Sequence, residues 1–257
     1  MYVAIDFGIS NTDLAISDQD KIVFHTTPSQ SSEINADTLK NILKKCDIDI
    51  SNVKKIGVTG GKSSDLDDEL DRVKIAKINE IDAIGLGAKK LYGIGEESAL
   101  VVSAGTGTAC VHVQGNNFNH LGGIAVGGGM LEGLGSLLFK NSNGLEINEF
   151  ANSGSRAELD LLIGDVVNKI GNLSPDITAV NFGQAKSSSA DTMENTAAAL
   201  CNMVGEVIGT VAYLNALLVG SDKACFIGRT SYLSEITDGI NQRLELAGIK
   251  GQYNDDR

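Results

Sequence analysis

Hydrophobic and polar residues alternate up to residue 26 in the way that is typical of a β-meander. The predicted strands are 2–5, 12–17 and 22–26, with a turn at 6–11 that contains Asp, Gly, Ser and Asn. After residue 32 the spacing becomes helical, with one apolar face made of Ile34, Leu39, Ile42 and Leu43. The segment 53–58 is then typical of a buried strand. The first part of the chain is therefore predicted to be β-β-β-α-β.

The same pattern recurs after residue 98. Strands are predicted at 99–103, 108–113 and 118–124, and an amphipathic helix is predicted to begin after Gly127, Gly128 and Gly129. Two copies of one unit favour an α/β fold with two similar lobes, each a mixed sheet with helices, that face each other across a cleft. The lobes are expected to occupy residues 1–95 and 96–257.

The last third of the chain is predicted to be mostly helical. Helices are expected at 159–170, 192–219 and 234–246, with a short strand at 223–228. The helix at 192–219 is apolar nearly all round, so it must be buried centrally or covered by a partner.

Composition narrows the classes of function. The chain has 257 residues, with 21 Lys and Arg against 33 Asp and Glu and a net charge of −12, which argues against a nucleic-acid partner. Its longest apolar stretch, 207–220, is shorter than the roughly 20 residues that a bilayer span needs, and its N-terminus lacks the basic lead of a signal peptide. The 4 cysteines are scattered, which suggests neither a zinc site nor a disulfide framework. We expect a cytoplasmic protein with no membrane partner.

Two glycine-centred turns occupy equivalent points of the two copies. The N-terminal glycine turn (residues 6–12) includes Gly8, Ser10, Asn11 and Thr12, and the C-terminal glycine turn (residues 103–108) includes Gly105, Thr106, Gly107 and Thr108. Backbone N–H groups and hydroxyls in such turns form anion-binding nests, so a pair of turns could hold successive phosphates of a nucleotide. The alternative is that both are ordinary hairpin turns.

Two further features could serve a nucleotide. Asp6 ends an apolar strand, where a carboxylate needs a cation or hydrogen-bond partner; a Mg²⁺ beside a polyphosphate would supply one, and a turn-capping role is the alternative. Gly127, Gly128 and Gly129 open a helix whose N-terminus could present donors to an anionic or planar ligand, although close helix packing would need the same glycines.

Glu80 and His120 are the candidates for acid–base chemistry. Glu80 lies in an apolar context after a basic segment, where a carboxylate could take the proton from an attacking hydroxyl; an exposed acid at a helix start is the alternative. His120 directly precedes a predicted turn at 121–123, whereas His25 and His112 lie in predicted strands and are interpreted as structural.

Several segments together resemble the type II (eukaryotic-like) pantothenate kinases. The similar segments are 80–83, 103–108, 120–124, 127–135, 179–183, 203–207 and 226–228. The resemblance runs from residue 1 to about 250. It implies the acetate/sugar kinase, Hsp70 and actin fold, with duplicated actin-like (ribonuclease H-like) lobes, and a homodimer built on the long helix. It also implies phosphorylation of pantothenate by Mg²⁺-ATP, the first step to coenzyme A.

The resemblance also implies roles for single residues. Glu80 would be the general base and Asp6 the metal-side acid. Gly8 and the C-terminal glycine turn would hold phosphates, Gly127–Gly129 would lie at the nucleotide, and Gly228 would end the adenosine-side strand. Thr106 and Gly122 would lie near the pantothenate together with Glu80 and His120.

The sequence departs from the family pattern at three places. The family has arginine where this chain has His120, and arginine is a permanent bidentate donor. In the N-terminal glycine turn, Ile9 and Ser10 replace a Gly-Thr pair and Asp13 replaces a lysine. The family normally continues beyond residues 253–257 into a glycine-rich helix that reaches the partner's acceptor site. A kinase for another small alcohol, or a nucleotide-binding regulatory dimer without phosphoryl transfer, therefore remain alternatives to a pantothenate kinase.

Overall fold

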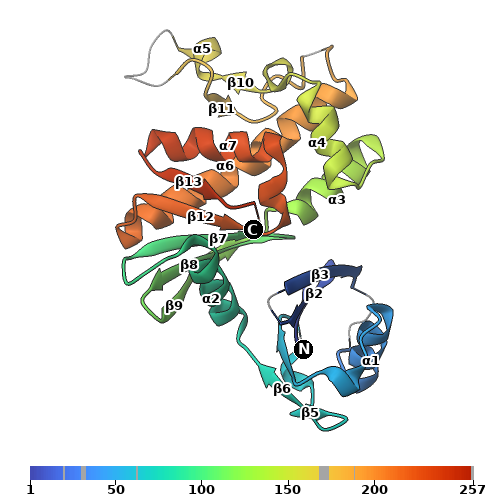
Figure 1. Cartoon of the computed structure of the whole chain (residues 1–257). Helices are drawn as coiled ribbons and strands as arrows, with labels where there is room; N and C mark the ends of the chain where they lie inside the picture. The colour runs from blue at the N-terminus through green and yellow to red at the C-terminus, as the bar shows by residue number, and fades with distance from the viewer. Residues whose placement is uncertain (20, 30–32, 62, 168–173, 188, 256–257) are drawn as a thin grey trace. The chain divides into compact units, whose positions relative to one another are not determined.

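Two compact units make up the chain in the computed structural model (Figure 1). The structure describes residues 1–257 except 20, 30–32, 62, 168–173, 188 and 256–257. The smaller unit is Met1–Ala83 and the larger is Ile84–Arg257, so they divide within the first turn of helix α2 (Glu80–Tyr92). The functional lobe boundary proposed at residue 95, after that helix, stays a prediction.

The smaller unit is a mixed sheet with one covered face. Its strands are β1 (Tyr2–Phe7), β2 (Asn11–Asp18), β3 (Lys21–Pro28), β4 (Lys55–Thr59), β5 (Glu69–Leu70) and β6 (Val73–Lys77), in the order β3-β2-β1-β4-β6-β5. Strand β1 is antiparallel to β2 and parallel to β4. Helix α1 (Ala36–Lys45), capped by the side chain of Asn35, packs its Leu39 and Leu43 against alternate residues of β1. The predicted meander, helix and strand are confirmed.

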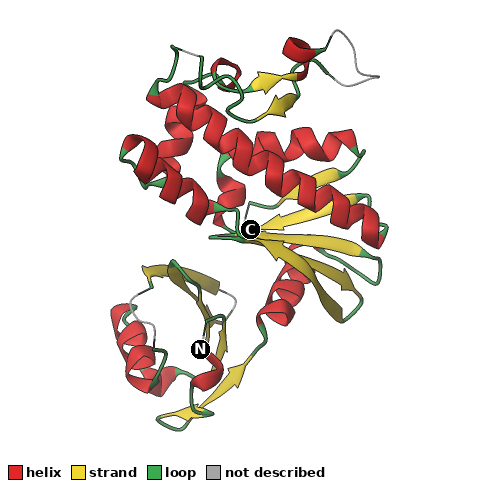
Figure 2. Ribbon diagram, turned by 180° about the vertical axis from the view of Figure 1, so that it is seen from behind, coloured by secondary structure: helices red, strands yellow, loops and turns green. Residues whose placement is uncertain are grey.

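The larger unit has a sheet covered on both faces. Its order is β13-β12-β7-β8-β9, built from β7 (Ala99–Ala104), β8 (Thr108–Gln114), β9 (Asn117–Ile124), β12 (Lys223–Ile227) and β13 (Lys250–Tyr253). Helix α6 (Met193–Val219), with α7 (Ser234–Leu246) beside it, covers one face, and α2 lies against the other (Figures 1 and 2). Helices α3 (Gly128–Phe139) and α4 (Gly144–Asn152) complete the layer on the α6 side. The second β-β-β-α copy is confirmed.

Helix α6 is the centre of the larger core. Ala197, Val204, Ile208 and Ala212 are all fully buried in one cluster with strands β7 and β12. By length and hydropathy this helix could cross a membrane, but 67% of its most apolar stretch is buried inside the structure. Burial of this kind is what the core helix of a globular domain shows, and it matches the first of the two alternatives, central burial or cover by a partner, that the sequence left open.

The helix predicted at 159–170 is wrong in its described part. Leu161–Leu162 form strand β10, which pairs with β11 (Thr178–Val180), and only the four residues Ile163–Val166 form a helix, α5. Residues 168–170 of the predicted helix lie outside the described residues. The backbone here bonds to a distant segment instead of to itself: Ile163 N–H donates to Ile177 O at 2.8 Å. Long-range pairing of this kind overrides a local helical spacing.

Candidate functional site

The N-terminal glycine turn is a tight connection held by Ser29. Its central residues lie between β1 and β2, and a Cβ at Gly8 would stand 2.6 Å from the carbonyl oxygen of Asn11, so only glycine fits. The Ser29 hydroxyl donates to Gly8 O at 2.7 Å, and the Ser29 N–H donates to Ser10 O at 3.0 Å. These bonds orient two turn carbonyls toward the end of β3. Ser29 is a supporting residue that sequence reasoning missed, because the bond spans two strands.

Asp6 lies in a row of polar residues on the sheet face opposite α1. Asp6 is paired in register with Asp13 of β2 and with Thr59 of β4, and Asp13 accepts a 2.6 Å hydrogen bond from the hydroxyl of Thr26. Carboxylates directly opposite each other on one face stand about 5 Å apart between their Cβ atoms. Two carboxylates and hydroxyl oxygens are the hard donors that Mg²⁺ prefers. The donor set fits a cation bound through one or two carboxylates, and the described residues hold no group of three or more His, Cys, Asp or Glu side chains that could form a complete metal cage.

Thr12 faces the other side of the same sheet. It is buried, and it pairs in register with Phe7, whose side chain packs in the core beneath α1. A cavity of about 360 Å³ lies on that side, lined in part by Gly8, Thr12, Ile34 and Thr38. The structure therefore brings the backbone of the turn close to Asp6 but places the Thr12 hydroxyl on the opposite face.

The C-terminal glycine turn is built from its own backbone and from the start of α3. Gly105 N–H donates to Gly107 O at 2.8 Å and closes the turn. The Gly105 and Thr106 carbonyls then accept hydrogen bonds from the N–H groups of Gly128 (2.8 Å) and Gly129 (3.0 Å). The side chain of Thr108 is also committed, because its hydroxyl donates to Val126 O at 2.8 Å. The turn and the helix N-terminus thus form one hydrogen-bonded unit.

Close packing explains the three glycines at the start of α3, the N-cap Gly127 and the first two helical residues. A Cβ at Gly127 would stand 2.6 Å from Gly105 O, and a Cβ at Gly129 would stand 2.6 Å from Thr106 Cγ2. Any larger side chain would push the helix away from the turn. The close helix packing that the sequence left open as an alternative is therefore observed. Two first-turn N–H groups of the helix already donate to carbonyls of the C-terminal glycine turn. The role of these glycines at a nucleotide stays a prediction.

Gly228 and Thr230 bring a third segment to the same place. Gly228, which ends β12, has a φ of +93°, and its Cβ would stand 2.5 Å from Ala104 O, so the strand end can approach β7 only with glycine there. The Thr230 hydroxyl donates to Gly105 O at 2.7 Å and accepts from Gly128 N–H at 3.0 Å. Sequence reasoning found Gly228 but missed Thr230. Three distant segments, 104–108, 127–129 and 228–230, therefore converge in the larger unit.

Glu80 begins helix α2 and is exposed. The side chain of the preceding Asn79 accepts a hydrogen bond from Ile81 N–H at 2.8 Å, and the Asn79 carbonyl accepts from Ala83 N–H at 2.9 Å. The first turn also contains Asp82, so the carboxylates lie at the positive end of the helix dipole. The capped helix fixes the backbone from which the Glu80 side chain projects.

The turn predicted at 121–123 is instead part of strand β9. Cys110 of β8 pairs with Gly122, but its neighbour Val111 pairs with His120, so Leu121 is an extra residue in a β-bulge. Gly122 has a φ of +130°, which the irregular backbone requires. His120 and Gly122 are thus neighbours across a bulge, and His120 is exposed. Glycines at a bulge resemble turn glycines in sequence, which is why the interpretation failed.

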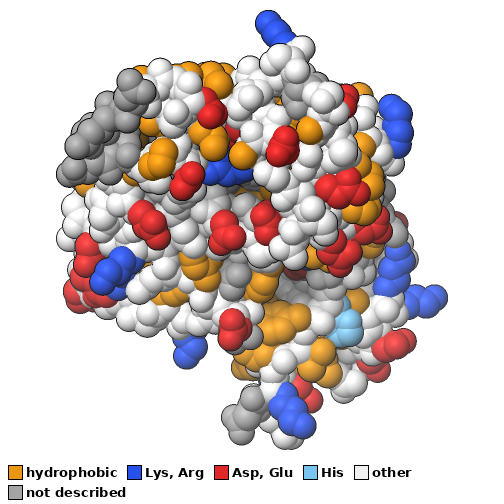
Figure 3. Space-filling model, turned by 90° about the horizontal axis from the view of Figure 1, so that it is seen from above, with side chains coloured by type: hydrophobic (Ala, Val, Ile, Leu, Met, Phe, Trp, Pro, Cys, Tyr) orange, Lys and Arg blue, Asp and Glu red, His pale blue; other side chains and the backbone are white. Residues whose placement is uncertain are grey.

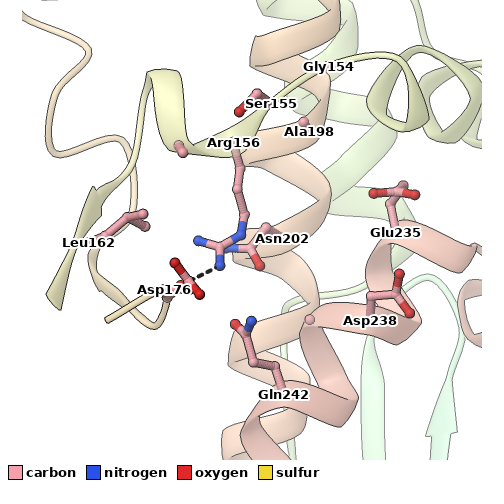
Figure 4. Close-up of a pocket in the computed structure, with 12 residues that line it drawn as sticks. Gly154, Ser155, Arg156, Leu162, Asp176, Ala198, Asn202, Glu235, Asp238 and Gln242 are labelled. Carbon is pink, nitrogen blue, oxygen red and sulfur yellow. Dashed lines mark hydrogen bonds between the residues drawn. The ribbon is translucent and has the colours of Figure 1, made fainter. Parts of the chain in front are cut away.

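A separate cavity of about 410 Å³ lies between α6, α7, residues 154–162 and Asp176, and Figure 4 shows its side chains. Arg156 extends toward Asn202, and Glu235, Asp238 and Gln242 approach from α7. Beneath Arg156, Asp160 is fully buried, and burial raises its pKa to about 6 against the opposing hydrogen bond from Phe182 N–H. The predicted site residues, all of which the structure describes, do not line this cavity.

Known proteins are similar to this chain over most of its length. The family model described as Fumble matches residues 92–240. A type II pantothenate kinase from Oceanobacillus iheyensis is 29% identical over 233 residues, which cover 89% of this chain and 84% of that protein. A type II pantothenate kinase from Bacillus cereus is 30% identical over 239 residues, which cover 89% of this chain and 82% of that protein.

Solved structures with the same fold are more distant in sequence. An activator of the 2-hydroxyisocaproyl-CoA dehydratase from Clostridium difficile with bound ADPNP superposes with a TM-score of 0.64 at 15% identity, covering 99% of this chain and 88% of that one. A ROK family glucokinase from Streptomyces griseus in complex with glucose and AMPPNP gives 0.56 at 12% identity, covering 98% and 91%. These likenesses confirm the expected α/β fold with two lobes.

Proposed function

Because this chain belongs to the Fumble family, and its similar curated relatives are type II pantothenate kinases, we propose that it transfers the γ-phosphoryl group of ATP to the hydroxyl of pantothenate. The product is 4'-phosphopantothenate, the first intermediate on the way to coenzyme A. The observation that carries the proposal is the agreement with those relatives across 89% of the chain. The convergence of three glycine-containing segments in the larger unit supports it.

The two glycine turns are proposed to hold the phosphates of ATP. In the larger unit, the carbonyls of Gly105 and Thr106 are hydrogen-bonded to α3, and that of Gly105 also to Thr230, which leaves the turn rigid before a ligand arrives. Preorganised donors cost no reorganisation during the reaction and so stabilise developing charge efficiently. Gly8, Ser10, Asn11 and Thr12 would do the same from the smaller unit, and Gly127–Gly129 and Gly228 would lie beside the nucleotide.

Glu80 is proposed as the general base. Its carboxylate would take the proton of the pantothenate hydroxyl while that oxygen attacks the γ-phosphorus and the bond to the ADP oxygen breaks. Thr106, His120 and Gly122 would position the acceptor. An imidazole can donate a hydrogen bond to the substrate carboxylate through a ring N–H, but it lacks the bidentate fork of the arginine found in the family. We therefore expect weaker binding of pantothenate than an arginine would give.

Asp6 is proposed to hold Mg²⁺, with Asp13 beside it. When bound, Mg²⁺ neutralises charge on the β- and γ-phosphates. The pairing of Asp6 with Asp13 places a second carboxylate where the family has a lysine. With a net charge of −12, the chain depends on backbone donors and a bound cation to attract an anionic nucleotide, so we expect activity to depend strongly on Mg²⁺.

A homodimer built on α6 is part of the proposal. Leu214, Leu217 and Leu218 are 54%, 56% and 73% exposed on the C-terminal half of a helix whose other residues are buried or half-buried. The three leucines are spaced i, i+3 and i+4, so they lie on one side of the helix. Contiguous exposed leucines are typical of a surface that a partner covers.

The proposed setting is the cytoplasm, without nucleic-acid or membrane partners. Acidic side chains are scattered over the face shown in Figure 3 and the Lys and Arg side chains stand singly, so that face has no basic patch. The cysteines are free, and burial raises the pKa of Cys110 to about 11 and of Cys201 to about 12, which keeps these thiols protonated. Both observations suit a metabolic enzyme in a reducing compartment.

The test is detection of phosphopantothenate by mass spectrometry after incubation of the purified protein with pantothenate and Mg²⁺-ATP. The Glu80→Gln variant is the matched control, because it keeps the size and hydrogen-bonding of the side chain but removes the base. We expect product with the wild-type protein and a loss of about 100-fold or more in kcat with the variant.

A panel of other small alcohols distinguishes the alternatives. Product from a different acceptor only would mean a kinase of this fold with another substrate. Bound ATP without product from any acceptor would contradict the kinase and indicate a regulatory nucleotide-binding dimer.

A further inference from the structure

Helix α2, which carries Glu80, is fastened to the larger unit at several points. At its C-terminal end the Tyr92 hydroxyl donates to Phe226 O, and Asn254 N–H donates to the Tyr92 oxygen at 3.1 Å. In the same last turn the Lys89 ammonium donates to Gly115 O at 2.6 Å and to Asn116 Oδ1 at 3.0 Å. The helix is therefore held at the β12 end and at the β8–β9 hairpin.

Gly85 of α2 packs closely against Phe118. Gly85 is buried, and the ring of Phe118 on β9 occupies the space where a Cβ at position 85 would stand. The nearest atoms include Cγ of the ring, at 2.5 Å, so a rotation of the ring tip alone would not make room. Gly87, two residues further along the same helix, has no neighbouring atom within 4 Å of its Cβ position. The glycine at 85 is thus required by contact with a ring, and the glycine at 87 is not.

The contacts give α2 a direction along β9. Lys89 of α2 bonds to Asn116, and Gly85, earlier in the helix, contacts Phe118, later in the strand. Helix α2 is therefore antiparallel to β9. The four residues from Gly85 to Lys89 span about 6 Å of helix, and the two residues from Asn116 to Phe118 span about 6.6 Å of strand, so the spacing of the two contacts agrees on both elements. Glu80 lies five residues before Gly85, about 7.5 Å further along the helix axis.

Phe118 and His120 lie on the sheet face that α2 covers. They pair with Val113 and Val111, which alternate along β8 with Cys110, a member of the core on the α6 side. From Gly85 toward its N-terminus, helix α2 therefore extends past Phe118 in the direction of His120. A shift of the helix at position 85 would be passed along its axis to Glu80.

We infer that Gly85 and Phe118 are a positioning pair, which sets how deeply α2 sits on the sheet and so where the helix presents Glu80 for phosphoryl transfer. This inference rests on the proposed function for its kinetic consequence. Neither residue is a catalytic residue, because neither is placed at a reacting atom. A displacement of about 1 Å in a catalytic group can cost about 100-fold in rate.

The test compares Gly85→Ala with Gly87→Ala, a matched substitution in the same helix. Gly85→Ala is expected to lower kcat by about 10- to 100-fold and to leave the KM for ATP within about two-fold, because the phosphate turns are not touched. Gly87→Ala is expected to keep kcat within about two-fold. Replacing the ring by a smaller side chain in Gly85→Ala/Phe118→Leu should recover most of the lost kcat, since the two positions are in contact.

A second measurement does not depend on turnover. Spin labels on Asp82→Cys and Asn119→Cys, both exposed positions, in a Cys46→Ser background report the distance between the start of α2 and β9. We expect Gly85→Ala to change this distance, Gly87→Ala to leave it unchanged and the double variant to restore it. Phe118→Leu alone provides a second variant if Gly85→Ala does not fold.

The outcomes separate the two proposals. Absence of product from the wild-type protein would refute the proposed function, and the label distances would still test the packing pair. Unchanged kcat and unchanged label distance in Gly85→Ala would overturn the positioning role. Equal losses of kcat in Gly85→Ala and Gly87→Ala would also overturn it, since only the former meets the ring.

Discussion

The hydroxyl of Thr230 donates a 2.7 Å hydrogen bond to the carbonyl oxygen of Gly105, 125 residues away in the chain. The same oxygen of Thr230 accepts from Gly128 N–H, so one buried side chain joins the three segments 104–108, 127–129 and 228–230. The shape of the proposed phosphate turn therefore depends on a residue that would not bind the phosphate.

Removal of that hydroxyl is expected to loosen the turn. Thr230→Val keeps the volume but leaves the Gly128 donor with only its bond to Gly105 O, and we expect a loss of about 1–2 kcal/mol in the free energy of unfolding. We also expect a rise in the KM for ATP with a smaller change in kcat. Thr230→Ser, which retains the oxygen, should stay close to wild type. Urea unfolding and steady-state kinetics on both variants provide the measurement, and equal behaviour of Val and Ser would contradict the role.

Two glycines, one at the N-cap of α3 and one inside the helix, should respond in opposite ways to alanine. Gly127→Ala forces a Cβ to 2.6 Å from Gly105 O, so we expect it to destabilise the protein by about 1–3 kcal/mol. Gly133→Ala meets no atom within 4 Å and should stabilise it by up to about 1 kcal/mol through helix propensity. Thermal unfolding of the two variants measures the contrast. A stabilising Gly127→Ala would show that the close packing against the turn is absent in solution.

The buried carboxyl of Asp160 should make stability depend on pH. Burial raises its pKa from 3.8 to about 6, so between these values the folded state binds a proton that the unfolded state has lost. Stability then falls as pH rises, by about 3 kcal/mol in all, of which about 2 kcal/mol falls between pH 4.5 and pH 7.

The Asp160→Asn variant isolates this effect. It removes the titrating group, so the difference in unfolding free energy between variant and wild type should change by about 2 kcal/mol from pH 4.5 to pH 7, in favour of the variant at the higher pH. Titrating groups that do not interact with Asp160, such as Glu235, whose pKa burial also raises, contribute equally to both proteins and cancel. Urea unfolding at several pH values measures the difference. A pH-independent difference would contradict the assignment.

The exposed leucines of α6 give a direct test of the proposed dimer. Leu218→Lys puts a charge in the middle of the proposed interface, and an unpaired charge there should cost several kcal/mol of association. We expect a shift from dimer to monomer in sedimentation at micromolar concentration, with little change in the far-ultraviolet circular dichroism of the protein. Leu246→Lys, at an exposed leucine of α7, is the control and should leave the dimer intact. A wild-type monomer, or a dimer that survives Leu218→Lys, would overturn the interface.

Sequence spacing predicted the strands and the long helix because their side-chain periods are local. The meander at 2–28, its second copy at 99–124 and helices α6 and α7 follow from alternation every second residue or from apolar faces every three to four. The candidate glycines were also visible, since glycine at a strand-to-strand connection or before a helix is a local signal. Strands β5, β11 and β13 were not predicted because segments of two to four residues carry too little periodicity. Strand β6 was also not predicted, although it is as long as β4.

Tertiary structure decided what the local patterns could not. The segment 159–170 has helical spacing, yet the N–H groups of Ile163 and Gly164 donate to Ile177 O and Pro175 O, and a local sequence window does not contain those partners. Leu121 became a bulge because the register of β9 is set by β8. The joining of Gly105, Gly128 and Thr230 also appears only after folding. The sequence by itself determined which residues have the chemistry of a phosphate site, because composition and spacing are local properties; only the tertiary structure decided which of them meet, because their contacts depend on hydrogen bonds and packing between segments far apart in the chain.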